Sequence, residues 1–303
     1  MSDFSSQTQP AHFSGNQKFL TKVKLLFFRN NPIANFALVI ILLLLAIGYI
    51  VPIILNLDPF GTSSELLLSP GTMSSNEVYY LLGTDDLGRD LFSRLVIGAR
   101  SSLNIGFFIV LVSAFVGTSM GLVAGVYGGA IDAFIMRLTD VIMSLPSILL
   151  AIVIVAVLGG GLVNAVIAVI IVSMPRYIRV VRSVAMSEMK KQYVVAAQSF
   201  GIKRFRILWS EILPNCRAPV IVQSTLGFSE AVLDIAALGF LGLGARPPAA
   251  DWGAMLADAR TYIESAPYLV VLPGVCILIT VLCFNIVGDA LRDRFDPKLG
   301  DSK

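Results

Sequence analysis

The sequence is poor in the residues that usually carry covalent or metal chemistry. Its one histidine, His12, lies in a polar stretch near the start, which excludes a histidine-centred metal, haem or triad site in the apolar segments. The nucleotide-binding pattern G-x-x-x-x-G-K-[ST] is missing. The three cysteines, Cys216, Cys276 and Cys283, do not form the pattern of a disulfide framework. We therefore expect no catalytic residues, and no metal or cofactor bound by this chain.

Charged residues are also scarce, and this determines the class of protein. They make up 14% of the 303 residues, against 56% hydrophobic residues, and the mean hydropathy is +0.80. A soluble domain of this length needs more charge to cover its surface. The runs without any charged residue are 31–57, 101–131, 141–175 and 265–288, and 218–245 contains only two acids.

Each run is long enough to cross a bilayer, because a helix needs about 20 residues to span a hydrocarbon layer of ~30 Å. The longest run holds two crossings separated by Gly159–Gly161, and Pro146 is expected to kink the first of them. The sequence thus predicts an all-α membrane protein with about six transmembrane helices. The predicted spans are 33–55, 103–126, 138–158, 162–180, 219–243 and 267–288.

Positive charge orients these helices. The first 30 residues carry Lys18, Lys22, Lys24 and Arg29, and the loop 176–217 holds nine Lys and Arg against two acids. Both segments are expected in the cytoplasm, because positive residues remain on that side. The predicted division is a cytoplasmic tail (1–30), a first transmembrane anchor (31–57), an external segment (58–100), a core of five transmembrane helices (101–290) and a cytoplasmic tail (291–303).

The loop after the fourth span has the most informative pattern. Apolar residues alternate with basic ones, Ala196 and Ala197 permit close packing, and Gly201 permits a sharp turn. Pro214 is expected to end the helix. One interpretation is a basic amphipathic surface lying on anionic membrane lipid. The other is a short helix–turn–helix that projects from the membrane towards a partner.

The spacing in this loop resembles the EAA loop of ATP-binding cassette (ABC) importer permeases. In that motif two alanines are followed, after three further residues, by a glycine and more distantly by Leu-Pro, as they are here. This sequence departs from the motif at Val195, where the motif usually has glutamate, and at Glu211, where it often has isoleucine. The resemblance implies that residues 196–204 form a coupling helix, which seats in a cleft of an ATPase subunit. The predicted coupling residues are Ala196, Ala197, Gly201, Ile202, Lys203, Arg204, Leu213 and Pro214.

Further segments extend the resemblance over most of the chain. These segments look like parts of the permeases of peptide and nickel importers, and most like the C-type permease subunit of dipeptide importers. They are residues 82–103, 128–151, 215–256 and 288–299. The resemblance implies a MetI-like type I importer fold in a bacterial inner membrane. The implied partners are a second homologous permease, two cytoplasmic ATPases that hold ATP and Mg, a periplasmic binding protein and a short peptide, with no nucleic acid.

Three alternatives remain open at this stage. The cargo of such a permease could be nickel or another small ligand. An ion-coupled secondary transporter would need its own coupling site, for which the only obvious residues are Glu230 and Asp234. A membrane scaffold that transports nothing is also compatible with the composition.

Glu230 and Asp234 are one helical turn apart in an apolar segment. Ionisable groups at membrane depth are expensive and normally face the bundle interior or a watery path. In one interpretation, both acids line the substrate path and attract the terminal ammonium of a peptide. In the other, they pair with basic groups on another helix or on a partner.

Two external segments carry further hypotheses. Asp85 with Arg89, and Asp90 with Arg94, have the spacing of ion pairs on a helix, with Thr84 as a possible N-cap. For these charges we favour a structural role over substrate contact.

In the loop 244–266, Trp252 and Tyr262 suit a membrane interface. Docking of a delivery protein on this loop is the alternative.

Overall fold

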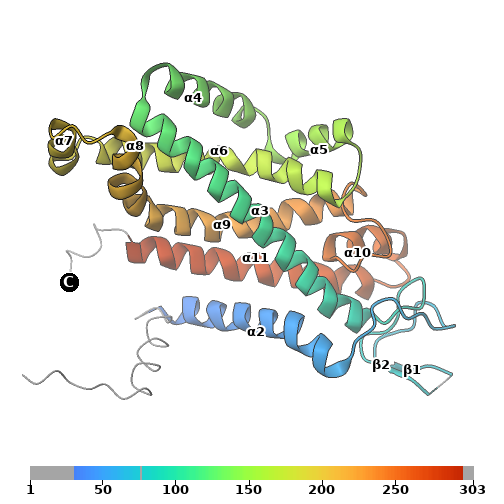
Figure 1. Ribbon diagram of the computed structural model, residues 1–303. Coiled ribbons are helices and arrows are strands. Elements are labelled where there is room, and N and C mark those ends of the chain that lie inside the picture. Colours follow the sequence, from blue (N-terminus) through green and yellow to red (C-terminus); the bar gives the residue numbers. More distant parts are fainter. Residues whose placement is uncertain (1–30, 76, 296–303) are drawn as a thin grey trace, which may run out of the picture.

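The computed structural model describes residues 31–75 and 77–295, which form a bundle of long helices (Figure 1). The predicted tails, 1–30 and the last part of 291–303, lie outside this range. The elements are α2 (Pro32–Leu55), β1 (Thr72–Met73), β2 (Tyr79–Tyr80), α3 (Leu91–Tyr127), α4 (Gly129–Met143), α5 (Ser147–Leu158), α6 (Leu162–Glu188), α7 (Gln192–Ser199), α8 (Arg204–Ile207), a π-helical turn (Leu208–Ile212), α9 (Leu213–Phe240), α10 (Trp252–Ala259), a 3-10 turn (Arg260–Tyr262) and α11 (Tyr268–Phe295).

Five helices in the described part of the chain are long and apolar enough to cross a membrane. They are α2, α3, α6, the α8–α9 unit and α11, and the bent pair α4–α5 makes a sixth crossing if it is one span. The all-α fold with about six transmembrane helices is therefore confirmed.

The prediction of a single kinked helix over 138–158 is wrong. The chain forms two helices, α4 and α5, that meet at an angle of 94°. Pro146 lies just before α5 with φ −56° and ψ 133°, outside the helical region. Because proline has no backbone N–H and its ring clashes with the preceding turn, the helix ends before it. The result is a broken helix.

The start of the second span also differs from the prediction. Thr84 is not an N-cap: its hydroxyl accepts a hydrogen bond from Leu68 N–H (2.9 Å). Helix α3 begins at Leu91, and the carboxylate of Asp90 caps it by accepting from Ser93 N–H (2.9 Å). This helix is 37 residues long and runs through the whole bundle (Figure 1).

Helices α3 and α6 lie in close contact along a row of glycines. Gly117, Gly121 and Gly125 are four residues apart and therefore share one face of α3. A Cβ at Gly117 would lie 2.5 Å from Tyr177 Cβ, and one at Gly121 would lie 2.7 Å from the carbonyl oxygen of Ile178. Small residues at such spacing let two helix backbones approach closely in a membrane.

Helix α2 lies at the edge of the bundle (Figure 1). Its residues Ala34, Ala37 and Ile41 are buried in one cluster with residues of α11. Its outer face is apolar and exposed, with Phe36 68% and Ile53 79% accessible. Exposed apolar side chains on a helix of this length suit contact with lipid.

Helix α10 is hydrogen-bonded to the N-terminal part of α3. The carboxylate of Asp251 caps α10 by accepting from Gly253 N–H (3.1 Å), and it also accepts from the hydroxyl of Ser102 (2.7 Å). The indole N–H of Trp252 donates to the carbonyl oxygen of Leu95 (3.1 Å). Trp252 is only 1% exposed, so its predicted place at a membrane interface is wrong. It packs between two helices.

Candidate functional site

The loop between α6 and α9 contains the predicted helix–turn–helix. Helix α7 ends at Ser199, and Gly201 follows with φ +78°. The N–H of Ile202 donates to the carbonyl oxygen of Ala197 (3.1 Å), and the N–H of Gly201 donates to that of Gln198 (2.9 Å). This pair of hydrogen bonds is a Schellman motif, which requires a left-handed residue after the helix and favours glycine there. Gly201 therefore reverses the chain between α7 and α8.

One side of this loop is buried against the bundle. Val194 and Ile207 are fully buried, and they belong to one apolar cluster with Val181 of α6 and Leu122 of α3. The loop is thus packed on the ends of α3 and α6, the two helices that meet along the row of glycines.

The other side of the loop is exposed and mixes aromatic with basic residues. Phe200 is 87% accessible, Phe205 64% and Trp209 54%. We define the α7–α8 tip as this surface together with the exposed Val195, Ala196, Ile202, Lys203, Arg204 and Arg206. Exposed apolar clusters rimmed by charge mark sites of interaction with a partner or a membrane.

The structure divides the predicted coupling residues into two groups. Residues 196–204 lie together, but they do not form one helix: 196–199 end α7, 200–203 form the turn and Arg204 begins α8. Leu213 and Pro214 lie in the first turn of α9 instead of on the tip. The prediction that Pro214 ends the helix is wrong, because the backbone is helical from Arg204 to Phe240 and Pro214 closely follows the π-helical turn within this continuous segment.

A polar cluster at the base of α7 was not expected from the sequence. Glu188, at the end of α6, accepts a hydrogen bond from the hydroxyl of Tyr193 (2.6 Å) and pairs with Lys191 (2.6 Å). The amide of Asn215 donates to the same hydroxyl (3.2 Å). The carboxylate of Glu188 raises the pKa of Tyr193 to about 12. These bonds hold the α6–α7 corner to the start of α9.

Glu230 forms an ion pair with Arg176 of α6. This contact agrees with the second interpretation of the acidic pair, in which each acid pairs with a basic group on another helix. Asp234 lies one helical turn further along α9, on the same face of the helix as Glu230. Two carboxylates therefore share the neighbourhood of one guanidinium. The side chains of Arg176 and Glu230 remain 38% and 45% exposed in the isolated chain.

Arg176 is the first of three arginines along one side of α6, which we call the arginine row. Arg179 pairs with Asp140 of α4 (2.7 Å). Arg182 pairs with Asp132 of α4, with 2.6 Å between its Nη2 and Oδ2. The sequence reading assigned these arginines to a basic loop and missed the row. Their spacing of three residues on a helix was the available signal.

A cavity of about 180 Å³ lies where α4 and α5 break. Arg176 and Val172 of α6 form one wall, and the two ends of the broken helix form the other. The lining residues are Ile142, Met143, Leu145, Ser147, Val172 and Arg176.

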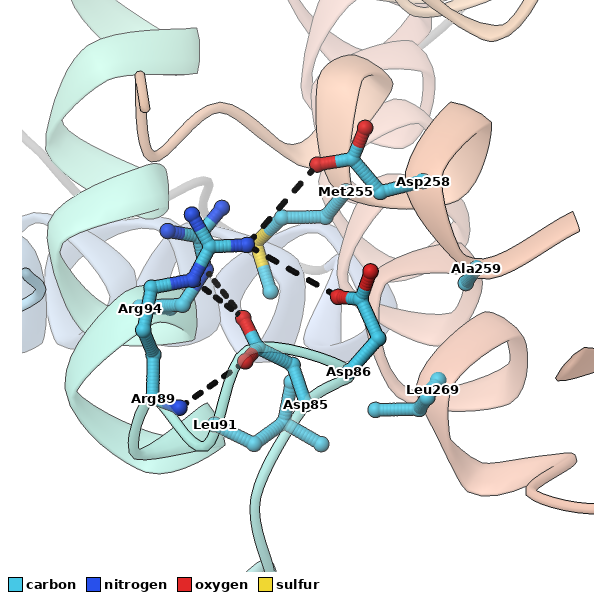
Figure 2. Close-up of a pocket in the computed structure, with 9 residues that line it drawn as sticks. All are labelled: Asp85, Asp86, Arg89, Leu91, Arg94, Met255, Asp258, Ala259 and Leu269. Atoms are coloured by element: carbon cyan, nitrogen blue, oxygen red, sulfur yellow. Dashed lines mark hydrogen bonds and ion pairs between the residues drawn. The ribbon is translucent and has the colours of Figure 1, made fainter. Parts of the chain in front are cut away.

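A second charged cluster, drawn in Figure 2, lies around the start of α3. Arg89 Nε is 2.6 Å and Arg94 Nε 3.3 Å from Asp85 Oδ2, and all three side chains are buried. Asp86 and Asp258 approach Arg89 Nη2 at 3.9 and 4.0 Å. Burial, followed by the charge of Asp86, raises the pKa of Asp258.

This cluster corrects part of the sequence prediction. Asp85 and Arg89 form the expected pair, but in a turn before α3. Arg94 pairs with Asp85, because Asp90 is used to cap the helix. The enclosed space is about 20 Å³, enough for one water molecule. The geometry therefore indicates a structural link between α3 and α10.

Comparison with known proteins adds an independent finding. Residues 117–301 match the family model described as a binding-protein-dependent transport system inner membrane component. The dipeptide transport system permease protein DppC of Haemophilus influenzae is 45% identical over 274 residues, covering 90% of this chain and 93% of that protein. The di/tripeptide transport system permease protein DppC of Pseudomonas aeruginosa is 48% identical over 273 residues, covering 90% of each.

A solved structure also shares the fold. The inward-facing MetNI methionine ABC transporter contains a chain that superposes with a TM-score of 0.53 at 19% identity. The superposition covers 67% of this chain and 96% of that one. At this identity the likeness concerns the architecture alone.

Proposed function

Because this chain belongs to the family of binding-protein-dependent transport system inner membrane components, and is a permease subunit of an ABC importer, we propose that it carries dipeptides or other short peptides across the inner membrane. The relatives named as dipeptide and di/tripeptide permeases support this cargo. Nickel or another small ligand is the second candidate cargo, since the same segments resemble both kinds of importer.

The proposed assembly contains this chain, a second homologous permease, two ATPases and a periplasmic binding protein. ATP and Mg belong to the ATPases, and this permease binds neither. The membrane-embedded chain supplies half of the path and has no catalytic residue of its own. Its exposed apolar faces contact membrane lipid or the second permease.

The α7–α8 tip is proposed to face the cytoplasm and to dock on an ATPase. The first residues of α2 and the last residues of α11 lie at the same end of the bundle as the tip (Figure 1). Both termini are then cytoplasmic, and the β1–β2 hairpin and α10 are periplasmic. The six basic residues between 190 and 217, after the end of α6, agree with this orientation.

The observation that carries this proposal is the contrast between the two sides of the tip. Phe200 projects almost fully into solvent, while Val194 and Ile207 behind it are fully buried against α3 and α6. An exposed aromatic side chain on a loop whose other side is well packed suits a surface that binds a partner and transmits the partner's movement to the bundle. Closure of the ATPase dimer would displace the tip, and α6 would move with it, which alternates access to the path.

The experiment is co-purification of the ATPases with a tagged form of this chain. We expect Phe200→Ala to weaken docking by about thirtyfold, which corresponds to ~2 kcal/mol for a buried aromatic anchor. The matched control is Phe36→Ala, because Phe36 is 68% exposed but lies on the outer face of α2. Retention of the ATPases by both variants would contradict the proposed docking surface. Peptide uptake by this chain alone would instead support the secondary transporter.

A further inference from the structure

Arg176, Glu230 and Asp234 lie where three features of the bundle meet. These three features are the ion pair between α6 and α9, the second carboxylate one turn along α9, and the cavity at the break between α4 and α5. We propose that these three residues form a transient binding site for the charged ends of a short peptide, with Arg176 for the α-carboxylate and the two acids for the α-ammonium. The proposal rests on the proposed function and deepens it.

The position of the group is the first argument. Arg176 lies near the middle of α6, and Glu230 is well inside α9. The α4–α5 break, which opens the cavity beside Arg176, divides a bent span. Charged groups at such depth normally face a water-filled path or a bundle interior. Irregular backbone at membrane depth is tolerated where it lines such a cavity.

The charge balance is the second argument. One guanidinium faces two carboxylates, so the group carries a net charge of −1 when all three are ionised. The other two arginines of the row differ, because Arg179 has Asp140 and Arg182 has Asp132 as partners. Arg176, which faces both acids, is the member of this group that lines the cavity. An incoming ammonium group neutralises the surplus negative charge and also releases Arg176 to pair with a carboxylate.

The cavity supplies the third argument. Its wall includes Arg176 on one side and Ser147, the first residue of α5, on the other. No side chain caps the first N–H groups of α5. A carboxylate held by Arg176 in this space therefore meets a guanidinium together with further hydrogen-bond donors. The apolar part of the lining, from Ile142, Leu145 and Val172, accepts side chains without selecting among them.

A charge swap separates this role from a purely structural ion pair. In Arg176→Glu combined with Glu230→Arg, an ion pair can form again with its polarity reversed. A structural pair would be restored by the swap, whereas a site for peptide termini would have its cation and its acid exchanged. We expect the complete importer carrying this double variant to assemble and hydrolyse ATP. Its uptake of labelled alanyl-alanine into proteoliposomes should fall by about tenfold or more, the loss typical of a charge-assisted hydrogen bond.

The matched control is the swap Arg179→Asp with Asp140→Arg, which reverses a pair of the same row outside the cavity lining. It should keep at least half of the wild-type uptake. Asp234→Asn provides a second test in case the double variant does not assemble. We expect this variant to raise the half-saturating peptide concentration about tenfold, and Asp234→Glu to restore it.

The outcomes distinguish the inference from the function beneath it. Wild-type uptake by the Arg176/Glu230 swap, or an unchanged half-saturating concentration in Asp234→Asn, overturns the binding site and leaves the peptide importer intact. Absence of peptide uptake by the wild-type complex overturns the proposed function itself.

Discussion

Replacing Gly121 by alanine tests whether the contact between α3 and α6 depends on the absence of a side chain. A Cβ at Gly121 would lie 2.7 Å from the carbonyl oxygen of Ile178 and 2.9 Å from Val181 Cβ. Neither atom belongs to the flexible end of a side chain, so relief requires that the two helices separate. The substitution therefore acts directly on the contact between α3 and α6.

The expected magnitude follows from two opposing effects. Overpacking of a close contact costs about 1–3 kcal/mol, and the rigid neighbours place Gly121→Ala near the upper value. Alanine recovers about 1 kcal/mol of helix propensity. The net loss is then about 2 kcal/mol in the free energy of unfolding, equivalent to a fall of about 3 °C in Tm for a chain of 303 residues at ~2.1 cal/mol/K per residue.

The assay is thermal unfolding in detergent, followed by the reaction of a thiol dye with Cys216, which is fully buried in the folded chain. All variants are compared at one scan rate, because membrane proteins often unfold irreversibly. Gly274→Ala is the matched control, since Gly274 lies inside α11 with no atom within 4 Å of its added Cβ. It should raise Tm by about 1–2 °C, from the gain of about 1 kcal/mol in helix propensity. An equal rise for Gly121→Ala would refute the packing argument.

Three further predictions concern the two ends of the bundle. Asp251→Ala should cost about 2–4 kcal/mol in thermal unfolding, because a helix cap and buried hydrogen bonds are lost together, while Asp251→Asn should cost less. Burial and the charge of Asp86 raise the pKa of Asp258, so the folded state binds its proton more tightly than the unfolded state. Stability from this group is present below its ordinary pKa of about 4 and is lost as pH rises through the raised value. The gain in Tm from Asp258→Asn should thus be larger at pH 7 than near pH 4. Tyr193→Phe removes a hydrogen bond to Glu188 and should speed amide exchange in α7 about tenfold, with no change in the amides of α2.

The number of crossings and the fold could be predicted because the bilayer imposes them. A helix in lipid must be apolar for about 20 residues, and charge-free runs of that length are visible in the sequence. The predicted spans 33–55 and 267–288 begin within one residue of the first residues of α2 and α11. The predicted reversal of the chain at Gly201 also holds, because a Schellman turn depends on local residues alone.

The break between α4 and α5 could not be predicted from its proline. Pro52, Pro175, Pro219 and Pro273 all lie inside helices that continue past them, while the helix stops at Pro146. In a membrane bundle, neighbouring helices can satisfy the backbone groups that a proline releases. Tertiary contacts therefore decide whether a proline bends a helix or ends it.

The ion pairs of α6 were missed for a simpler reason. The predicted span ended at 180, whereas α6 continues to Glu188, so Arg182 belongs to a helix and not to a basic loop. The glycine row of α3 was visible as a four-residue spacing from Gly117 to Gly125, but its partner helix was not. Which helix faces a given row depends on the arrangement of the bundle, and residue spacing carries no information about it.

Helix α6 physically connects the α7–α8 tip with the proposed peptide site. Val194 and Ile207, on the buried side of the loop that carries the tip, pack on Val181, which is about 7.5 Å along the helix from Arg176 at a rise of 1.5 Å per residue. Residues 176–188 contain no glycine or proline, so this part of α6 is stiff. Pro175 directly precedes Arg176 and removes one hydrogen bond of the helix. We infer that a displacement of the tip moves residues 176–188 as one body and bends α6 at Pro175. The contact between Arg176 and Glu230 crosses from this moving segment to α9, so closure of the ATPase dimer changes the distance between these two side chains.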